Sequence, residues 1–253
     1  PGNDWAPSFD LKDKKGKRIL LELDYGKEEH WVNHFYYLLP FFKDERYVKI
    51  DGMPVFGFMR SGDIEPLKCI RDCWKQLAKK NGFPDIVLIS SKRPVLEPNI
   101  FDYNFLYEPS YSGWRYRELI SSRLKKYFGI SIKRNNSYKY LINYDDYWKK
   151  LLKNARLNSS KNTFLGGLVS FDDTPRRGNL ARIIDGATPL KFKNNFSQLF
   201  EISCVKDKDL LFLTAWNEWG EGAYLEPDEH FGYGYLEALK SAKEIVFNKL
   251  NLQ

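Results

Sequence analysis

The stretch that decides the fold is Leu210-Leu211-Phe212-Leu213-Thr214-Ala215-Trp216, which runs directly into Asn217-Glu218-Trp219-Gly220-Glu221-Gly222. The first seven residues form a short, mostly apolar run, as buried parallel strands tend to do. Polar residues then begin abruptly, as they do in the loop that leads from a parallel strand to its helix. This junction predicts a parallel α/β sheet with its chemistry at the carboxyl ends of the strands.

The same alternation of short apolar runs and longer amphipathic runs recurs along the chain. Further strands are expected at Val55–Met59, Ile86–Ser90, Tyr103–Tyr107 and Leu165–Phe171. Helices are expected at His30–Leu39, Ile64–Asn81, Trp114–Phe128, Tyr144–Ala155, Phe192–Glu201 and, most clearly, from Tyr235 to Leu250. Strands that alternate with helices predict parallel α/β architecture. Because no repeat or linker interrupts the sequence, residues 1–253 are expected to form a single domain.

Length and composition are those of a globular domain. The 253 residues are 43% hydrophobic and 16% aromatic, with a mean hydropathy of −0.53, which suffices for a sizeable core and excludes intrinsic disorder. The longest apolar runs are far shorter than the roughly 20 residues that a membrane-spanning helix needs. We therefore expect no transmembrane segment.

Cysteine and histidine are sparse, which bears on location and on metals. Cys69, Cys73 and Cys204 are too few, and odd in number, for a disulfide scaffold, so the sequence predicts a reducing, cytoplasmic setting. Cys69 and Cys73 have no third ligand nearby, and His30 and His34 lack the His-Glu-x-x-His order, so both pairs are expected to lie on helix faces. No metal is expected. No nucleotide-phosphate loop is evident, and no cofactor is expected.

The chain is basic, with 40 Lys and Arg against 33 Asp and Glu, a net charge of +7 and a pI near 9.1. Such a balance raises the possibility of a nucleic-acid partner. However, the basic residues fall into short separate runs at Lys12–Arg18, Arg123–Lys126 and Lys149–Arg156. Dispersed charge is typical of a solvated face, so no nucleic-acid partner is expected. A nucleic-acid binder would lose affinity steeply with salt.

Polar residues follow most of the expected strands. They are Arg60, then Ser90 and Ser91, then Glu108, then Asp172 and Asp173, then Asn217 and Glu218. The carboxyl ends of parallel strands lie at one edge of the sheet, where such folds place their chemistry. These side chains are therefore expected to converge.

Glu218 and Glu221 form the strongest local signal. Two carboxylates three residues apart can lie on one turn and face a common substrate atom. Gly220 and Gly222 allow backbone angles that bulkier residues resist. Like charges held close together raise one pKa, and apolar burial adds to that shift. The pair therefore offers one neutral and one ionised carboxyl group.

Aromatic residues surround this pair. Trp216, Trp219 and Tyr224 supply flat apolar faces of the kind that stack on sugar rings. Glycoside chemistry needs this setting, because one carboxyl group protonates the departing oxygen while the other acts ionised. The alternatives are a surface turn rich in acids and a non-catalytic glycan-binding module that keeps the aromatic platform. Replacing either glutamate by Gln separates an enzyme from a binding module.

Three stretches match motifs of a known family. Residues 216–228 read like the signature WNEWxEGxxLEPD, which residues 232–238 continue. Residues 46–56 resemble RYIKIDGKPVF, and residues 171–177 resemble WDNTPRR. Through these motifs most of the chain resembles the WbsX-like glycosyltransferase family, which is related to the endo-α-mannosidases of glycoside hydrolase family 99.

The resemblance implies a (β/α)8 TIM-type barrel with the glutamate pair after the eighth strand. In the related mannosidases the first glutamate acts as a base on the sugar 2-hydroxyl, so that an anhydro-sugar forms, and the second is the general acid and later the base. By this resemblance, the first role falls to Glu218 and the second to Glu221. Arg176 and Arg177 would face the sugar or an acidic substituent. The implied function is cleavage or transfer of glycosyl units in building a bacterial surface polysaccharide, such as lipopolysaccharide O-antigen or capsule.

The resemblance also concerns the start of the chain and the wider site. Family members begin with about three further strands, and Asn3-Asp4-Trp5 resembles the remainder of a segment after the third, so an incomplete barrel is expected. The partner is expected to be an oligosaccharide or polysaccharide. The candidate substrate-binding residues are Trp5, Arg60, Glu108, Asp172, Arg176, Arg177, Trp216, Asn217, Trp219, Tyr224 and Glu226.

Overall fold

The computed structural model describes residues 24–59, 64, 66–91, 100–114, 140–208 and 210–251. Packing divides the chain into two compact units, residues 1–105 and 106–253, each with its own hydrophobic core. Whether the two units form the single domain expected over residues 1–253 stays a prediction. The expected helix Trp114–Phe128 lies, beyond Trp114, outside the described residues.

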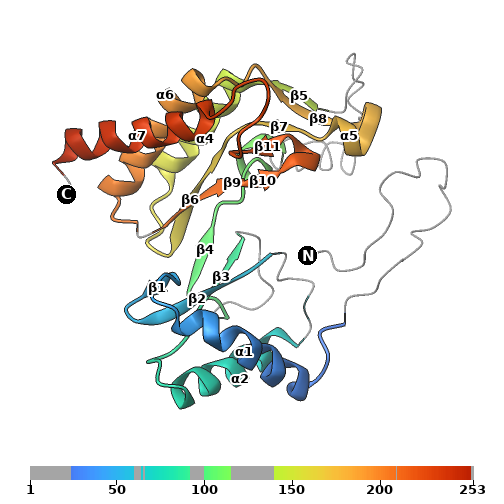
Figure 1. Ribbon diagram of the computed structural model, residues 1–253, viewed down its shortest axis with the longest axis vertical. Helices are drawn as coiled ribbons and strands as arrows, with labels where there is room; N and C mark the ends of the chain where they lie inside the picture. The colour runs from blue at the N-terminus through green and yellow to red at the C-terminus, as the bar shows by residue number, and fades with distance from the viewer. Residues whose placement is uncertain are drawn as a thin grey trace, which may run out of the picture. The chain divides into compact units, whose positions relative to one another are not determined.

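The first unit packs two helices beside a small sheet (Figure 1). Its elements are α1 (Glu28–Lys43), β1 (Lys49–Ile50), β2 (Met53–Phe58), α2 (Leu67–Lys80), β3 (Val87–Ser91) and β4 (Tyr103–Phe105). Strands β1 and β2 form an antiparallel hairpin, and β2, β3 and β4 run parallel in that order. The unit thus has the parallel strands with intervening helix that the sequence predicts.

Aromatic side chains fill the core between α1 and α2. Phe35 and Trp74 are buried with ring centroids 6.0 Å apart, and the Trp74 indole N–H donates to the carbonyl of Trp31 at 2.9 Å. His30 and His34 both lie on α1, as expected. His30 Nδ1 accepts the backbone N–H of Lys27 at 3.1 Å, and the His34 ring contacts Trp74 edge-on, with centroids 5.3 Å apart.

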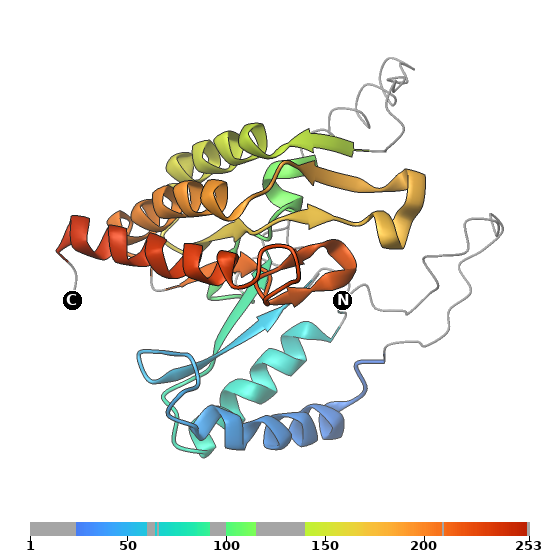
Figure 2. The ribbon, with the colours of Figure 1, turned by 45° about the horizontal axis from the view of Figure 1, so that its top comes forward.

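The second unit is larger and combines a layer of helices with several short pairs of strands (Figure 2). Its helices are the π-helical turn η2 (Ser110–Trp114), α4 (Tyr144–Leu157), α5 (Thr174–Arg177), the 3-10 turns η3 (Gly178–Leu180) and η4 (Trp219–Glu221), α6 (Pro189–Val205) and α7 (Gly234–Leu250). Helix α6 packs against both α4 and α7. Phe192 of α6, which is fully buried, contacts Trp148 of α4 and Tyr235 of α7.

The strands of the second unit fall into three groups. They are β5 (Tyr140–Asn143), β6 (Thr163–Leu168), β7 (Phe171–Asp172), β8 (Arg182–Asp185), β9 (Leu211–Thr214), β10 (Asn217–Glu218) and β11 (Ala223–Tyr224). Strands β6 and β9 are parallel, β5 is parallel to β8, and β7 is antiparallel to β8. Strands β10 and β11 form a short antiparallel hairpin.

Local sequence explains where two of the long helices begin. The Asn143 side chain accepts the backbone N–H groups of Asp145 and Asp146 at the start of α4. Thr188 caps α6 through the backbone N–H of Lys191, and Pro189 occupies its first turn, where no N–H is needed. Both caps follow the carboxyl end of a strand, β5 and β8 respectively.

The expected elements are largely confirmed, with small shifts at their ends. Helices α1, α2, α4, α6 and α7 and strands β2, β3, β4, β6 and β9 lie where periodicity predicts them. The expected strand Leu165–Phe171 is instead divided, because β6 ends at Leu168 and β7 begins at Phe171 and pairs with β8. Strands β5 and β8 were not predicted.

Gly166 provides a direct test of how β6 is packed. A Cβ atom at this position would lie 1.7 Å from the carbonyl oxygen of Leu106, which is backbone and cannot rotate away. We expect Gly166→Ala to lower the free energy of unfolding by about 3 kcal/mol in urea titrations. Gly113→Ala is the control, since its Cβ would meet neighbours only at 3.7 and 3.8 Å. A Gly166→Ala loss no larger than the control's would contradict this packing.

Candidate active site

The segments that follow β6 and β9 come together at one edge. Because these strands are parallel, with Leu168 level with Thr214, the chain leaves both at the same side. Beyond β6 the Ser170 hydroxyl donates to the carbonyl of Gly222, beyond β9, at 2.5 Å. The loop that carries the two glutamates is thereby attached to the loop that carries Arg176.

Gly222 allows this close approach. Its φ of +55° lies in the left-handed region. A Cβ atom there would lie 3.1 Å from the backbone nitrogen of Asp172 and 3.2 Å from its carbonyl oxygen. Only a residue without a side chain therefore fits between η4 and β7.

Glu221 is paired with Arg176 at this junction. The Glu221 side chain is 18% exposed, and its Oε1 accepts from Arg176 Nη1 at 2.5 Å. The residues that the structure describes form no hydrogen bond to Oε2 of Glu221. Arg176 thus holds one carboxyl oxygen of Glu221, while the other has no hydrogen-bond partner among the described residues.

The pKa of Glu221 is raised above its usual value of 4.5, chiefly because burial disfavours the anion. The Arg176 guanidinium opposes this rise, the carboxylate of Glu218 adds to it, and smaller effects come from Arg182, which lowers the pKa, and Asp173, which raises it. The carboxyl groups of Glu218 and Glu221 are therefore close enough to interact. Glu218 itself, in β10, is exposed.

A buried carboxylate organises the neighbouring arginines. Asp173 has no exposed side-chain area, and its Oδ2 accepts from Arg177 Nε at 2.8 Å and Arg182 Nε at 3.2 Å. The backbone N–H of Arg182 donates to Oδ1 at 2.6 Å. The Arg182 guanidinium lies 4.7 Å from the ring centroid of Trp114. Asp173 thereby fixes two of the three arginines beside the glutamate pair.

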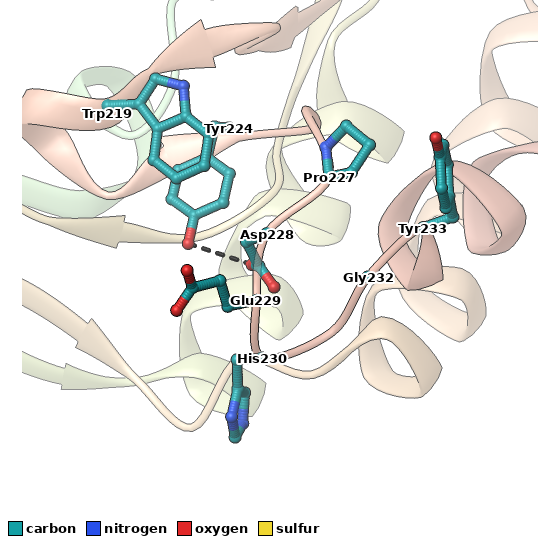
Figure 3. Close-up of a pocket in the computed structure, with 8 residues that line it drawn as sticks. All are labelled: Trp219, Tyr224, Pro227, Asp228, Glu229, His230, Gly232 and Tyr233. Carbon is teal, nitrogen blue, oxygen red and sulfur yellow. Dashed lines mark hydrogen bonds between the residues drawn. The ribbon is translucent and has the colours of Figure 1, made fainter.

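Two aromatic side chains of the same segment, Trp219 and Tyr224, form a stacked pair (Figure 3). Trp219 stacks on Tyr224 with ring centroids 3.8 Å apart and planes 17° from parallel. The Trp219 N–H donates to Glu226 Oε2 at 2.6 Å, and the Tyr224 hydroxyl donates to Asp228 Oδ2 at 3.1 Å. Trp216 and Trp219 remain about half exposed, at 54% and 48%. Each of the two indole side chains thus keeps exposed area that a ligand can contact.

An open pocket of about 720 Å³ lies beyond this stack. Its lining comprises Trp219 of η4 and Tyr224 of β11, together with residues of the segment that joins β11 to α7, which are Pro227, Asp228, Glu229, His230, Gly232 and Tyr233 (Figure 3). Neither Glu218 nor Glu221 lines it. The sequence analysis did not propose Glu229, His230 or Tyr233 as site residues, although the motif over residues 232–238 pointed to this segment.

Two features are absent from the part of the chain that the structure describes. No helix there is long and apolar enough to cross a membrane. No group of three or more His, Cys, Asp or Glu side chains within those same residues is arranged to hold a metal ion.

Comparison with known proteins decides the family. A family model described as Glycosyltransferase WbsX matches residues 2–239. The chain belongs to this WbsX family. The resemblance stated from the motifs is confirmed, and family membership places the chain among carbohydrate-active enzymes.

This WbsX-family chain is similar in sequence to a curated protein and in fold to two solved structures. The protein WxcX of Xanthomonas campestris pv. campestris, described as uncharacterized, is 30% identical over 100 residues, which cover 38% of this chain and 14% of WxcX. A glycoside hydrolase-like protein aligns with a TM-score of 0.53 and 14% identity, covering 87% of this chain and 62% of its own. The GH99 endo-alpha-mannosidase from Bacteriodes thetaiotaomicron, in complex with BIS-TRIS-propane, aligns with a TM-score of 0.52 and 14% identity. The alignment covers 91% of this chain and 69% of the mannosidase chain. The two structures show a shared α/β fold.

The predicted site residues of the WbsX-family chain fall into three groups. The first gathers in the second unit around the glutamate pair and comprises Asp172, Arg176, Arg177, Trp216, Asn217, Trp219, Tyr224 and Glu226. Glu108 forms the second, because it is 1% exposed. Trp5 and Arg60 lie outside the described residues. The roles of all these residues stay predictions.

Glu108 lies in the interior, held by its own neighbours. Its carboxylate accepts the Ser112 hydroxyl at 2.6 Å, the Ser112 backbone N–H at 2.9 Å and the Tyr147 hydroxyl at 2.9 Å. Burial raises the pKa of Glu108 to about 7, although these hydrogen bonds oppose the rise. Its carbonyl oxygen accepts from the hydroxyl of Thr214 at the end of β9 at 2.8 Å. Glu108 therefore contacts the carboxyl end of β9, the strand that leads to the glutamate pair.

Proposed function

We propose that this chain cleaves or transfers glycosyl units of a bacterial surface polysaccharide through the Glu218 and Glu221 pair. The observation that carries the proposal is the half-buried carboxyl group of Glu221, which is bound by Arg176 and raised in pKa by burial and by Glu218. Glycoside chemistry needs one carboxyl group that is protonated near neutral pH beside one that is ionised. Exposed aromatic faces next to the pair support a sugar substrate.

The proposed roles follow the family resemblance. Glu218 takes the proton of the 2-hydroxyl, whose oxygen attacks the anomeric carbon to give an anhydro-sugar. Glu221 gives its proton to the departing glycosidic oxygen, so that the leaving sugar departs as an alcohol. Glu221, now ionised, then takes a proton from water or from a sugar hydroxyl, whose oxygen attacks the anomeric carbon and breaks its bond to the 2-oxygen. Glu218 returns its proton to that 2-oxygen, so the anhydro-sugar opens and both glutamates regain their starting states. Water as acceptor gives hydrolysis, and a sugar hydroxyl gives transfer. The exposure of Glu218 supports this division, and so does Oε2 of Glu221, to which the described residues form no hydrogen bond.

Arg176 sets the pH range in which Glu221 is protonated. A general acid works only in its protonated form, so activity falls as the pH rises through the pKa of Glu221. Arg176 lowers that pKa by stabilising the anion. We therefore expect Arg176→Ala to move the alkaline limb of the kcat/KM profile to higher pH, and Arg176→Lys, which keeps the charge, to move it less. An alkaline limb that stays in place or moves to lower pH in Arg176→Ala would refute this role.

A length assay tests the activity itself. Fluorescently labelled bacterial surface polysaccharide fragments and α-mannan oligosaccharides are incubated with the protein and separated by size. Shorter products indicate hydrolysis, and longer products indicate transfer to an acceptor. Glu218→Gln is expected to abolish either change while keeping glycan binding. Binding by the wild type without any change in length would instead establish the non-catalytic glycan-binding module.

The wider setting is part of the proposal. A (β/α)8 barrel is supported by the parallel strands with intervening helices in each unit and by the fold shared with the two solved structures. Three cysteines, all in the free form, support a reducing, cytoplasmic location. The dispersed basic residues support a glycan rather than a nucleic-acid partner.

A further inference from the structure

The pocket between the Trp219–Tyr224 stack and α7 has two aromatic walls. Trp219 presents a half-exposed indole on one side, and Tyr233, 66% exposed, stands at the N-cap of α7 on the other (Figure 3). Pro227 and Asp228 come from the segment that joins them. The volume of about 720 Å³ is within the range of small-molecule sites and exceeds the needs of one sugar ring.

The floor of this pocket is built around Asp228. One of its carboxylate oxygens accepts the Tyr224 hydroxyl at 3.1 Å, and the other accepts the backbone N–H of Phe231. The backbone of Asp228 also pairs with that of Gly232, which closes the turn. The position of the stacked rings and the shape of the turn therefore depend on the same side chain, so the pocket is formed before any ligand binds.

The charge of the pocket is opposite to that of the chain. Its lining residues include the carboxylates of Asp228 and Glu229 together with His230, and no Lys or Arg is among the described residues that line it. Glu229 is exposed and makes no hydrogen bond or ion pair with the described part of the chain. A chain with a net charge of +7 thus presents a negative pocket. Carboxylates accept hydrogen bonds from hydroxyl groups and repel anions.

We propose that this pocket is a subsite for a neutral pyranose, which stacks on Trp219 or Tyr233 and donates its hydroxyls to Glu229 and Asp228. The subsite rests on the proposed function, since it would hold a second sugar ring of the same glycan. Trp219 connects the two places, because it lines the pocket and stands between Glu218 and Glu221 in the chain. The negative lining disfavours uronic acids and phosphorylated sugars at this position, because it repels their anionic groups.

Binding of simple sugars tests the subsite without any turnover. The probes are the methyl glycosides of glucose, galactose and mannose, each beside its uronate, titrated at pH 7 by saturation-transfer NMR. We expect at least one neutral glycoside to bind, and its uronate to bind at least about threefold more weakly. Tyr233→Ala should lower the affinity for the neutral glycoside by about threefold to tenfold. Tyr233→Phe, which keeps the aromatic ring, should bind this glycoside as the wild type does.

Charge and location are tested by two further variants. Glu229→Gln keeps a hydrogen-bond acceptor and removes the negative charge. The difference in affinity between the neutral glycoside and its uronate should therefore become smaller. Glu244→Gln, at an exposed position of α7 outside the pocket, should leave neutral-sugar binding unchanged. The subsite is refuted if no neutral glycoside binds, if Tyr233→Ala binds as tightly as Tyr233→Phe, or if uronates bind equally well. Sugar binding in the pocket of a protein that never alters glycan length refutes the proposed function alone, whereas altered length without pocket binding refutes the subsite alone.

Discussion

Glu221→Gln is expected to lower kcat about 10³-fold, with glycan affinity kept within about twofold of the wild type. The amide has the shape of the carboxyl group, and its oxygen can still accept from Arg176 Nη1, so the loop should keep its geometry. What the amide lacks is a proton that it can give to the departing oxygen. Turnover is measured as the change in glycan length and affinity by titration with the same glycan.

The control for this variant is Glu237→Gln. Glu237 is exposed in the first turn of α7 and belongs to the same unit, so its loss of charge should leave kcat within about twofold. A Glu221→Gln protein that retains more than about a tenth of wild-type kcat would show that another group supplies the proton.

Asp173→Ala is expected to lower the free energy of unfolding by about 4 kcal/mol, the largest loss of stability foreseen for a single charged side chain near the site. The Asp173 side chain is fully buried and binds two guanidinium groups and a backbone N–H. Without it, Arg182, whose side chain is 19% exposed, keeps its charge in a largely buried place and loses the ion pair that it makes with Asp173. Urea unfolding measures the loss.

Two comparisons make the Asp173 experiment specific. Asp173→Asn keeps the shape and one acceptor oxygen, so its loss should fall between those of the wild type and Asp173→Ala. Asp185→Ala, exposed at the end of β8, should change stability by no more than about 0.5 kcal/mol. A loss below about 1 kcal/mol for Asp173→Ala would mean that the arginines find other partners.

Periodicity located the long elements well because their signal is local. The apolar face of α7 and the apolar run of β9 are complete within the segments themselves. Strand β8 (Arg182–Asp185) carries charged residues at both ends and is short, so no pattern distinguishes it from a loop. It is defined instead by β5 and β7 on either side, which are distant in sequence. The division between β6 and β7 likewise depends on pairing with β8.

The candidate site was predictable in part for the same reason. Glu218, Glu221 and the aromatic residues stand within one motif, so the sequence alone could bring them together. The contact between Arg176 and Glu221 joins residues 45 apart and needs the parallel pairing of β6 with β9. The burial of Asp173 and its ion pair with Arg182 could not be predicted from the sequence. The neighbouring Asp172 has the same side chain and is exposed, so residue type does not distinguish the two. Solvent exposure is a property of the packed unit.

The claim on which the account depends is that the carboxyl groups of Glu218 and Glu221 act on each other. Its most direct measurement is a ¹³C NMR titration of the Glu221 side-chain carboxyl carbon, assigned by its disappearance in Glu221→Gln. The account predicts that the pKa of Glu221 lies above 4.5 in the wild type and falls in Glu218→Gln, because a neighbouring negative charge that disfavours the anion has been removed. A pKa at or below 4.5, or one that Glu218→Gln leaves unchanged, would contradict it.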